Sequence, residues 1–166
     1  MINTRIRAAV AGDVPQMVLL LNPIIEAGGS TAHQTLFDED RMRGHYYART
    51  GQVSCQIAIT NGRLSGFQSL LSPDPVHDPM PDGWASIASF VALDKSGLGI
   101  GQKLFSATRA AAKAAGVHTI DATIRADNVA GLRYYGGLGF VDYDKIPDLP
   151  LTDGTPVTRI RKKLAI

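Results

Sequence analysis

The most informative stretch of the chain reads Lys95-Ser96-Gly97-Leu98-Gly99-Ile100-Gly101-Gln102. Residues 84–93 before it form a mostly apolar run, typical of a buried central strand. Residues 101–115 after it carry apolar side chains at helical spacing. A helix N-terminus presents unpaired N–H groups and about half a positive charge, and glycines let a ligand approach the backbone closely. The stretch therefore predicts an anion site, with pyrophosphate as the common occupant, although a strand-to-helix turn without a ligand would use the same glycines.

Strand and helix patterns alternate on both sides of this loop. Strands are expected at 4–9, 53–60, 63–71, 84–93, 118–124, 139–144 and 156–164. Helices are expected from Asp13, as N-cap, to Ile25, at 38–50, at 101–115, and from Asp127 or Asn128 to about 136. Asn61-Gly62, between the second and third strands, is a strong hairpin signal. This order predicts one α/β (α+β) domain over residues 1–166, with a mixed sheet of about seven strands and four helices.

One long connection interrupts this alternation. Residues 72–83 hold four prolines and three aspartates, so they form neither a helix nor an inner strand. This proline-rich loop and the C-terminal strand are natural contact surfaces.

The composition excludes several classes of protein. The chain has 166 residues, of which 45% are hydrophobic and 19% charged, which supplies one core and excludes a disordered chain. The net charge of +2 is too small to indicate a basic surface that binds nucleic acid. No apolar segment reaches the ~18 residues of a membrane helix. The single cysteine, Cys55, fits a core position and a reducing compartment, so we expect a cytoplasmic protein. The charge and the lack of a long apolar segment predict that it binds neither nucleic acid nor membrane.

Two known phosphate-binding motifs fit the glycine loop poorly. A nucleotide-triphosphatase P-loop needs Gly-Lys followed by Ser or Thr, whereas Gly101 is followed by Gln102. A dinucleotide fingerprint needs Gly-x-Gly-x-x-Gly, and here the third glycine comes one residue early. Asp121, 20 residues after Gly101, lies where that motif has its ribose-binding acid. However, the loop follows three earlier strands instead of opening the first βαβ unit.

The loop resembles that of the acyl-CoA-dependent N-acetyltransferases of the GNAT superfamily. Their motif, Arg/Gln-x-x-Gly-x-Gly/Ala, enters a long helix after the fourth strand, and residues 96–101 match it except at the first position. Ser96 stands where Arg or Gln is usual, and Lys95 or Lys103 is the candidate replacement for the cation. A second motif of the family places Tyr seven residues after Asn and then Gly-Phe. Asn128, Tyr135 and Gly139-Phe140 keep that spacing.

The resemblance implies a cofactor and a reaction. The fold would be the family's central mixed, mostly antiparallel sheet, and acetyl-CoA would donate the acetyl group without a metal. Tyr135 would protonate the leaving thiolate, and a backbone N–H near Phe90 or Val91 would bind the oxyanion. The residues implied to contact the cofactor are Phe90, Val91, Ser96, Gly97, Leu98, Gly99, Ile100, Gly101, Gln102 and Asn128.

A weaker resemblance concerns the acceptor. Asn22 to Ile25, followed by Ser30-Thr31-Ala32, is similar to the phosphinothricin and L-amino-acid acetyltransferase branch. Members of that branch acetylate small amines and commonly form homodimers, so the resemblance implies a small-molecule primary amine as acceptor and a homodimer as a possible assembly. Many relatives of this type carry Glu, as general base, at the position of Ser86. Here the strand offers only Ser86 and Ser89, which are poor bases. The other candidate bases are more often surface or structural residues: Glu26, His33, His77, Asp78 and Asp82.

Alternatives to this reading stay open. A bound water could replace the missing carboxylate. The absence of Glu at position 86, and Ser96 in place of Arg or Gln, also fit a CoA-binding or small-molecule-binding module without catalysis. A protein or peptide N-acetyltransferase is a further alternative.

Overall fold

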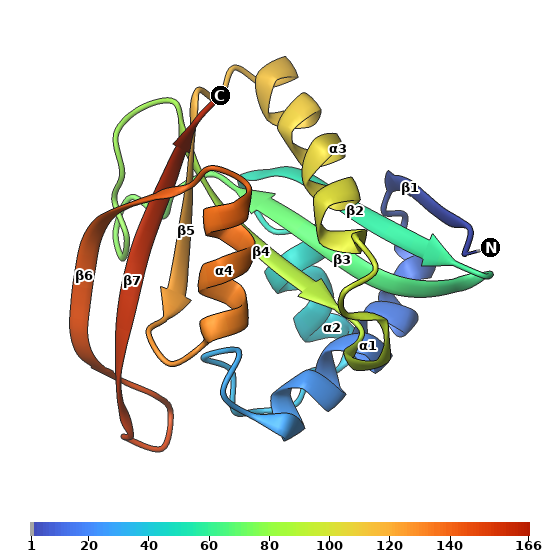
Figure 1. Cartoon of the computed structure of the whole chain (residues 1–166), viewed down its shortest axis with the longest axis horizontal. Coiled ribbons are helices and arrows are strands. Elements are labelled where there is room, and N and C mark those ends of the chain that lie inside the picture. The colour runs from blue at the N-terminus through green and yellow to red at the C-terminus, as the bar shows by residue number, and fades with distance from the viewer. Residues whose placement is uncertain (1) are drawn as a thin grey trace.

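A single seven-stranded sheet runs through the protein (Figure 1), whose computed structural model describes residues 2–166. Its strands are β1 (Thr4–Ala8), β2 (Gln52–Thr60), β3 (Arg63–Leu71), β4 (Trp84–Val91), β5 (Thr119–Arg125), β6 (Val141–Pro150) and β7 (Pro156–Ala165). The spatial order is β1-β2-β3-β4-β5-β7-β6, and every neighbouring pair is antiparallel except β4 and β5. This arrangement confirms the predicted mixed, mostly antiparallel sheet.

The helices lie on both faces of the sheet. They are α1 (Val14–Ala27), α2 (Glu39–Met42), α3 (Ile100–Ala114) and α4 (Val129–Gly137). Buried residues of α1 and α2, with Cys55, pack on one face, and those of α3 and α4 pack on the other. The core position predicted for Cys55 is therefore confirmed. No helix in residues 2–166 is long and apolar enough to cross a membrane.

Two predicted elements differ from the structure. The helix expected at 38–50 is a single α-turn, α2, followed by a π-helical turn over Arg43–Tyr47. The wider turn brings Tyr46 into the core against Phe67 and Phe90. The strand expected at 139–144 continues to Pro150 as β6. Two register shifts against β7 break its alternation, which is the signal that sequence reading relies on.

The parallel pair β4–β5 is short and then separates. It covers only Trp84 with Thr119, Ala85 with Ile120, and Ser86 with Asp121. Beyond it, β4 stays paired with β3 and β5 stays paired with β7, so the two strands diverge (Figure 1). We call the open stretch between residues 87–91 of β4 and 122–125 of β5 the fork.

Gly83 begins the parallel pair. Its carbonyl oxygen accepts hydrogen bonds from the backbone N–H groups of His118, at 2.9 Å, and Thr119, at 3.4 Å. Its φ of +81° lies in the left-handed region, and a Cβ at this position would overlap the His118 ring. Gly62 has a similar φ of +79° in the β2–β3 hairpin but has open space around it.

Gly83→Ala should therefore destabilise the protein more than Gly62→Ala. Gly62→Ala adds only left-handed strain, about 1–2 kcal/mol. Gly83→Ala adds the overlap with His118, for a total of about 2–4 kcal/mol. Urea unfolding followed by circular dichroism measures both free energies of unfolding. Equal losses would show that the contact at His118 does not constrain the start of the pair.

Candidate functional site

The glycine loop has the backbone geometry of an anion-binding turn. Gly97 and Gly99 have φ of +79° and +75°, which side chains other than glycine rarely adopt. Gly99 is the N-cap of α3, a helix of 15 residues, so the first N–H groups of α3 have no partner within the helix. Ser96, Gly97 and Leu98 are exposed around them. The loop thus presents free donors and the positive end of the helix dipole to an accessible surface.

The last residues of the motif also have a packing role. Ile100 is 2% exposed and packs with Ala58 and Leu104 on the sheet. A Cβ on Gly101 would lie 2.5 Å from the ring of Tyr134, whose hydroxyl donates to the Gly101 carbonyl at 2.7 Å. The third glycine therefore lets α4 pack closely against the start of α3.

The two candidate cations differ in their surroundings. Lys95 Nζ forms an ion pair with Asp94 at 3.2 Å. Lys103 is exposed in the first turn of α3, next to the free N–H groups. Lys103 is therefore the better placed of the two to stand in for the cation missing at Ser96.

The fork exposes one edge of β4. The N–H of Ala92 donates to the Ser65 carbonyl at 2.9 Å, and antiparallel ladders alternate in such pairs. Phe90 therefore directs its backbone groups to β3, and its side chain is buried against Tyr46 and Phe67. Ser89 and Val91 direct theirs into the fork. Of the two residues expected to supply an oxyanion N–H, Val91 faces the fork and Phe90 does not.

Tyr135 lies beside this edge, on the α3 and α4 face. Its hydroxyl is 2.7 Å from Ser89 Oγ, and its side chain is buried. Burial raises the pKa of Tyr135 well above its ordinary value, while the hydrogen bond with Ser89 opposes that rise. The phenol therefore holds its proton at neutral pH and can act as a hydrogen-bond donor.

Gln68 is a site residue that sequence reading missed. It is fully buried in β3, and its Nε2 donates to Ser89 Oγ at 2.8 Å and to the Tyr134 hydroxyl at 3.1 Å. The only sequence signal is one amide in β3, where the other residues after Arg63 are apolar, Ser or Gly.

Asn128 is the N-cap of α4, and it is one of the two residues predicted for that position. Its Oδ1 accepts from the N–H of Gly131 at 3.0 Å, and its Nδ2 donates to the Ser30 carbonyl at 3.2 Å. A Cβ on Gly131 would lie 2.5 Å from Asn128 Nδ2, so this glycine leaves room for the cap. The other candidate cap, Asp127, instead pairs with Arg125 at 2.8 Å.

The histidines and aspartates considered as bases are mostly held in other interactions. His33 Nε2 is 2.6 Å from the Tyr46 hydroxyl, and burial, with His45 and Arg41 nearby, lowers the pKa of His33 to about 4. His77 pairs with Asp74, and Asp78 forms a two-point ion pair with Arg161 at 2.9 and 3.0 Å. Glu26 and Asp82 are exposed.

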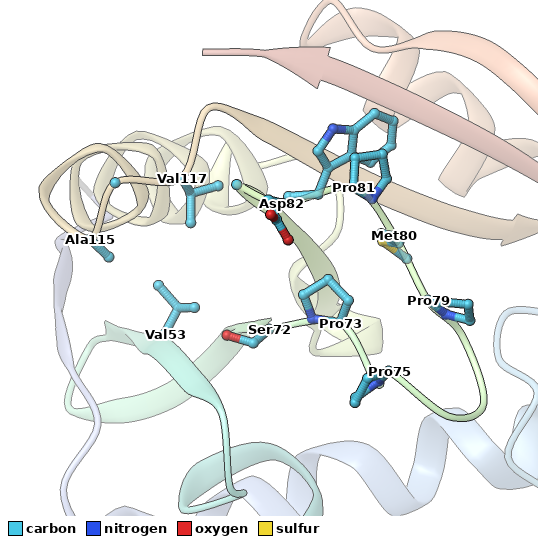
Figure 2. Close-up of a pocket in the computed structure, with 13 residues that line it drawn as sticks. Val53, Ser72, Pro73, Pro75, Pro79, Met80, Pro81, Asp82, Ala115 and Val117 are labelled. Atoms are coloured by element: carbon cyan, nitrogen blue, oxygen red, sulfur yellow. The ribbon is translucent and has the colours of Figure 1, made fainter.

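Two cavities lie away from the glycine loop. The larger, about 400 Å³, lies between the proline-rich loop and the C-terminal end of α3 (Figure 2). Figure 2 shows Pro73, Pro81 and Val117 in its wall, and none of the predicted cofactor residues line it. The smaller, about 240 Å³, includes Ser86 in its wall. No cluster of three His, Cys, Asp or Glu side chains in residues 2–166 could hold a metal ion.

Comparisons with known proteins agree with this geometry. The family model described as "Acetyltransferase (GNAT) family" matches residues 20–140. A comparison with curated protein sequences gave no match.

Several solved structures share the fold. An N-acetyltransferase from Staphylococcus aureus Mu50 superposes with a TM-score of 0.84 at 19% identity, over 98% of each chain. A ribosomal-protein-alanine N-acetyltransferase from Brucella melitensis has a TM-score of 0.82 at 21% identity, over 98% of this chain and 99% of its own. A phosphinothricin acetyltransferase from Sinorhizobium meliloti, in complex with acetyl-CoA, has a TM-score of 0.83 at 17% identity, over 98% of this chain and 88% of its own. The match over most of the chain, together with the glycine loop and the fork, shows that the chain belongs to the GNAT family of acetyl-CoA-dependent N-acetyltransferases.

Proposed function

We propose that the protein transfers the acetyl group of acetyl-CoA to the primary amine of a small molecule, by direct attack of the neutral amine on the thioester. The observation that carries this proposal is the fork, which has a buried phenol, Tyr135, beside its open edge and the glycine loop at the end of β4. The phosphinothricin acetyltransferase among the similar structures supports the choice of a small acceptor.

The donor would bind along β4 and at the start of α3. Backbone N–H groups of residues 97–102 would bind the pyrophosphate, with Ser96 and Leu98 at the exposed rim of the loop. The open edge of β4, at Ser89 and Val91, would pair with the amides of the pantetheine arm. Asn128 would contact that arm from the start of α4. Phe90 would contribute its buried ring, which supports the strand from behind.

Tyr135 would act as the general acid. The thiolate of CoA needs a proton as the thioester bond breaks, and a phenol that stays protonated at neutral pH supplies one. The N–H of Val91 or Ser89 would bind the oxygen that becomes negative during the attack.

A protein acceptor is the second candidate. It is favoured by one observation, the similarity to an enzyme described as a ribosomal-protein-alanine N-acetyltransferase. Free-thiol release distinguishes the candidates when small amines (glycinamide, L-leucine, L-methionine, tyramine and putrescine) are compared with an alanine-initiated peptide. Turnover only with the peptide would favour the second candidate, and no turnover with any acceptor would favour a CoA-binding module. The homodimer and the cytoplasmic location stay predictions, and sedimentation velocity measures the first.

Tyr135→Phe should lower kcat at least about tenfold with the best acceptor of that panel, because the leaving thiolate loses its acid. The affinity for acetyl-CoA should stay within about twofold, because the hydroxyl would act on the transition state more than on the bound donor. Steady-state kinetics by thiol release measures both quantities.

Tyr134→Phe is the matched control. It removes the hydroxyl of the neighbouring residue, which bonds to the Gly101 carbonyl. We expect a lower melting temperature but a kcat close to wild type. Unchanged turnover in Tyr135→Phe would remove this residue from the acid role.

CoA should raise the melting temperature, because a ligand that binds only the folded state stabilises it. At 100 times the dissociation constant the gain is about 2.7 kcal/mol. Differential scanning fluorimetry with increasing CoA measures the shift. No shift at millimolar CoA would contradict the assignment of acetyl-CoA as the donor.

Lys103→Ala should weaken CoA binding about threefold to tenfold, because an exposed cation beside phosphate contributes a modest attraction. Lys95→Ala is the control, since Lys95 already pairs with Asp94, and it should change the affinity less than twofold. Isothermal titration at low and high salt measures both. The Lys103 effect should shrink at high salt, and an equal effect in the two variants would contradict the assignment.

A further inference from the structure

Ser86 and Asp121 form the last side-by-side pair before the fork opens. They are paired across the parallel strands β4 and β5, so their side chains lie on the same face of the sheet. Ser86 Oγ donates to Asp121 Oδ2 at 3.3 Å. Beyond Ser86, the residues of β4 on this face are Ala88 and Phe90, which carry no polar side chain. The carboxylate that Ser86 contacts therefore comes from the neighbouring strand.

Asp121 is fixed in place and fully buried. Its Oδ1 accepts from the Tyr143 hydroxyl at 2.6 Å and from Arg161 Nε at 3.2 Å, and its Oδ2 accepts from Thr123 Oγ1 at 3.2 Å and from Ser86. These four donors match the roughly four lone-pair sites of a carboxylate. Asp121 is therefore unavailable to a ligand and can act only through the groups that it holds.

Among these four partners, Ser86 is the one that lines either of the two cavities described above. It lines the smaller cavity of about 240 Å³, together with Arg49, Leu71, Pro73, Asp78 and Met80. A hydroxyl has one hydrogen and two lone pairs, and Asp121 takes the hydrogen. Toward the cavity, Ser86 Oγ therefore presents hydrogen-bond acceptor capacity only.

We propose that Ser86 Oγ, oriented by Asp121, accepts an N–H hydrogen bond from the acceptor amine in this cavity at the closed end of the fork. The inference rests on the proposed function, because it assigns the acceptor site of that reaction. An amine that gives one N–H to Ser86 keeps its nitrogen lone pair free to attack a thioester in the fork. Ser86 is then an acceptor-binding residue, and Asp121 is a positioning residue that acts through it.

The chemistry of the cavity restricts the acceptor. A site that offers a lone pair selects a group with an N–H, so a neutral primary amine binds there and a neutral tertiary amine, which has no N–H, does not. Arg161, which bonds to Asp121, also holds Asp78 of the proline-rich loop at 2.9 and 3.0 Å. That contact fixes the cavity wall opposite β4, and the apolar side chains of Leu71, Pro73 and Met80 line the space for the body of a small molecule.

The first test compares Ser86→Ala with wild type, using the best acceptor of the amine panel. Loss of one hydrogen bond to a polarised hydroxyl should raise the acceptor KM about tenfold. The KM for acetyl-CoA should stay within about twofold, because Ser86 lies at the closed end of the fork, away from the glycine loop. Ser86→Thr keeps the hydroxyl and should restore the acceptor KM to within about threefold of wild type.

Tyr143→Phe separates binding from stability. It removes the shortest hydrogen bond to Asp121, but Tyr143 does not line the cavity. We expect a lower melting temperature and an acceptor KM close to that of wild type. The opposite ranking, with Tyr143→Phe raising the acceptor KM as much as Ser86→Ala, would indicate a purely structural role for the cluster.

Asp121→Asn tests whether Asp121 acts through Ser86. If it does, this change raises the acceptor KM in wild type but adds little in the Ser86→Ala background, so the two effects are not additive. A CoA-induced rise in melting temperature checks that each variant is folded. An acceptor KM in Ser86→Ala within about twofold of wild type would overturn the inference alone. Wild-type protein that releases no thiol with any amine would overturn the proposed function as well.

Discussion

The single parallel pair in the sheet, β4 with β5, is the constraint on which the site depends. Parallel neighbours need a crossover connection, and α3 provides it. The crossover places the N-terminus of α3 directly after the carboxyl end of β4, where it meets the glycine loop. In open α/β sheets, ligands bind at the carboxyl ends of strands where the connections diverge, and this βαβ unit creates such a point within a mostly antiparallel sheet.

The fork stays open because its two strands follow different partners. β5 pairs with β7 over seven residues, from Thr119 to Arg125, whereas it pairs with β4 over only three. The right-handed twist of each half of the sheet then accumulates at the junction. Asp121 strengthens this division, because its ion pair with Arg161 and its bond to Tyr143 attach it to β7 and β6. A fully buried carboxylate needs such hydrogen-bond partners. Of the remaining two, Thr123 lies on the same strand as Asp121, and Ser86 alone comes from β4.

Local interactions could be predicted from the sequence, and distant ones could not. The start of α3 after Gly99 and the cap at Asn128 depend on neighbours within four residues, so their patterns are visible in the chain. The motif predicts Gly101 as a cofactor-binding glycine, but the contact of Gly101 with Tyr134 joins residues 33 positions apart, and no spacing rule indicates that contact. The same holds for Gln68 with Tyr134, 66 positions apart, and for Asp121 with Arg161, 40 positions apart. From the sequence, Asp121 matches only the position of a ribose-binding acid, because alternation places a side chain on a face without naming its partner.

The direction of the hydrogen bonds around Tyr135 follows from the chemistry of one amide. Gln68 Nε2 can only donate, so Ser89 Oγ accepts from it. Ser89 then has its own hydrogen to give to the Tyr135 oxygen, 2.7 Å away. In that arrangement the Tyr135 hydrogen needs no protein partner and can point into the fork, and a phenolate formed there would keep one hydrogen bond. Gln68 Oε1 is buried without a partner in residues 2–166, which is costly for a group that served only stability. A fixed donor direction toward the phenol that we propose as the general acid is a physical reason for keeping an amide at this position.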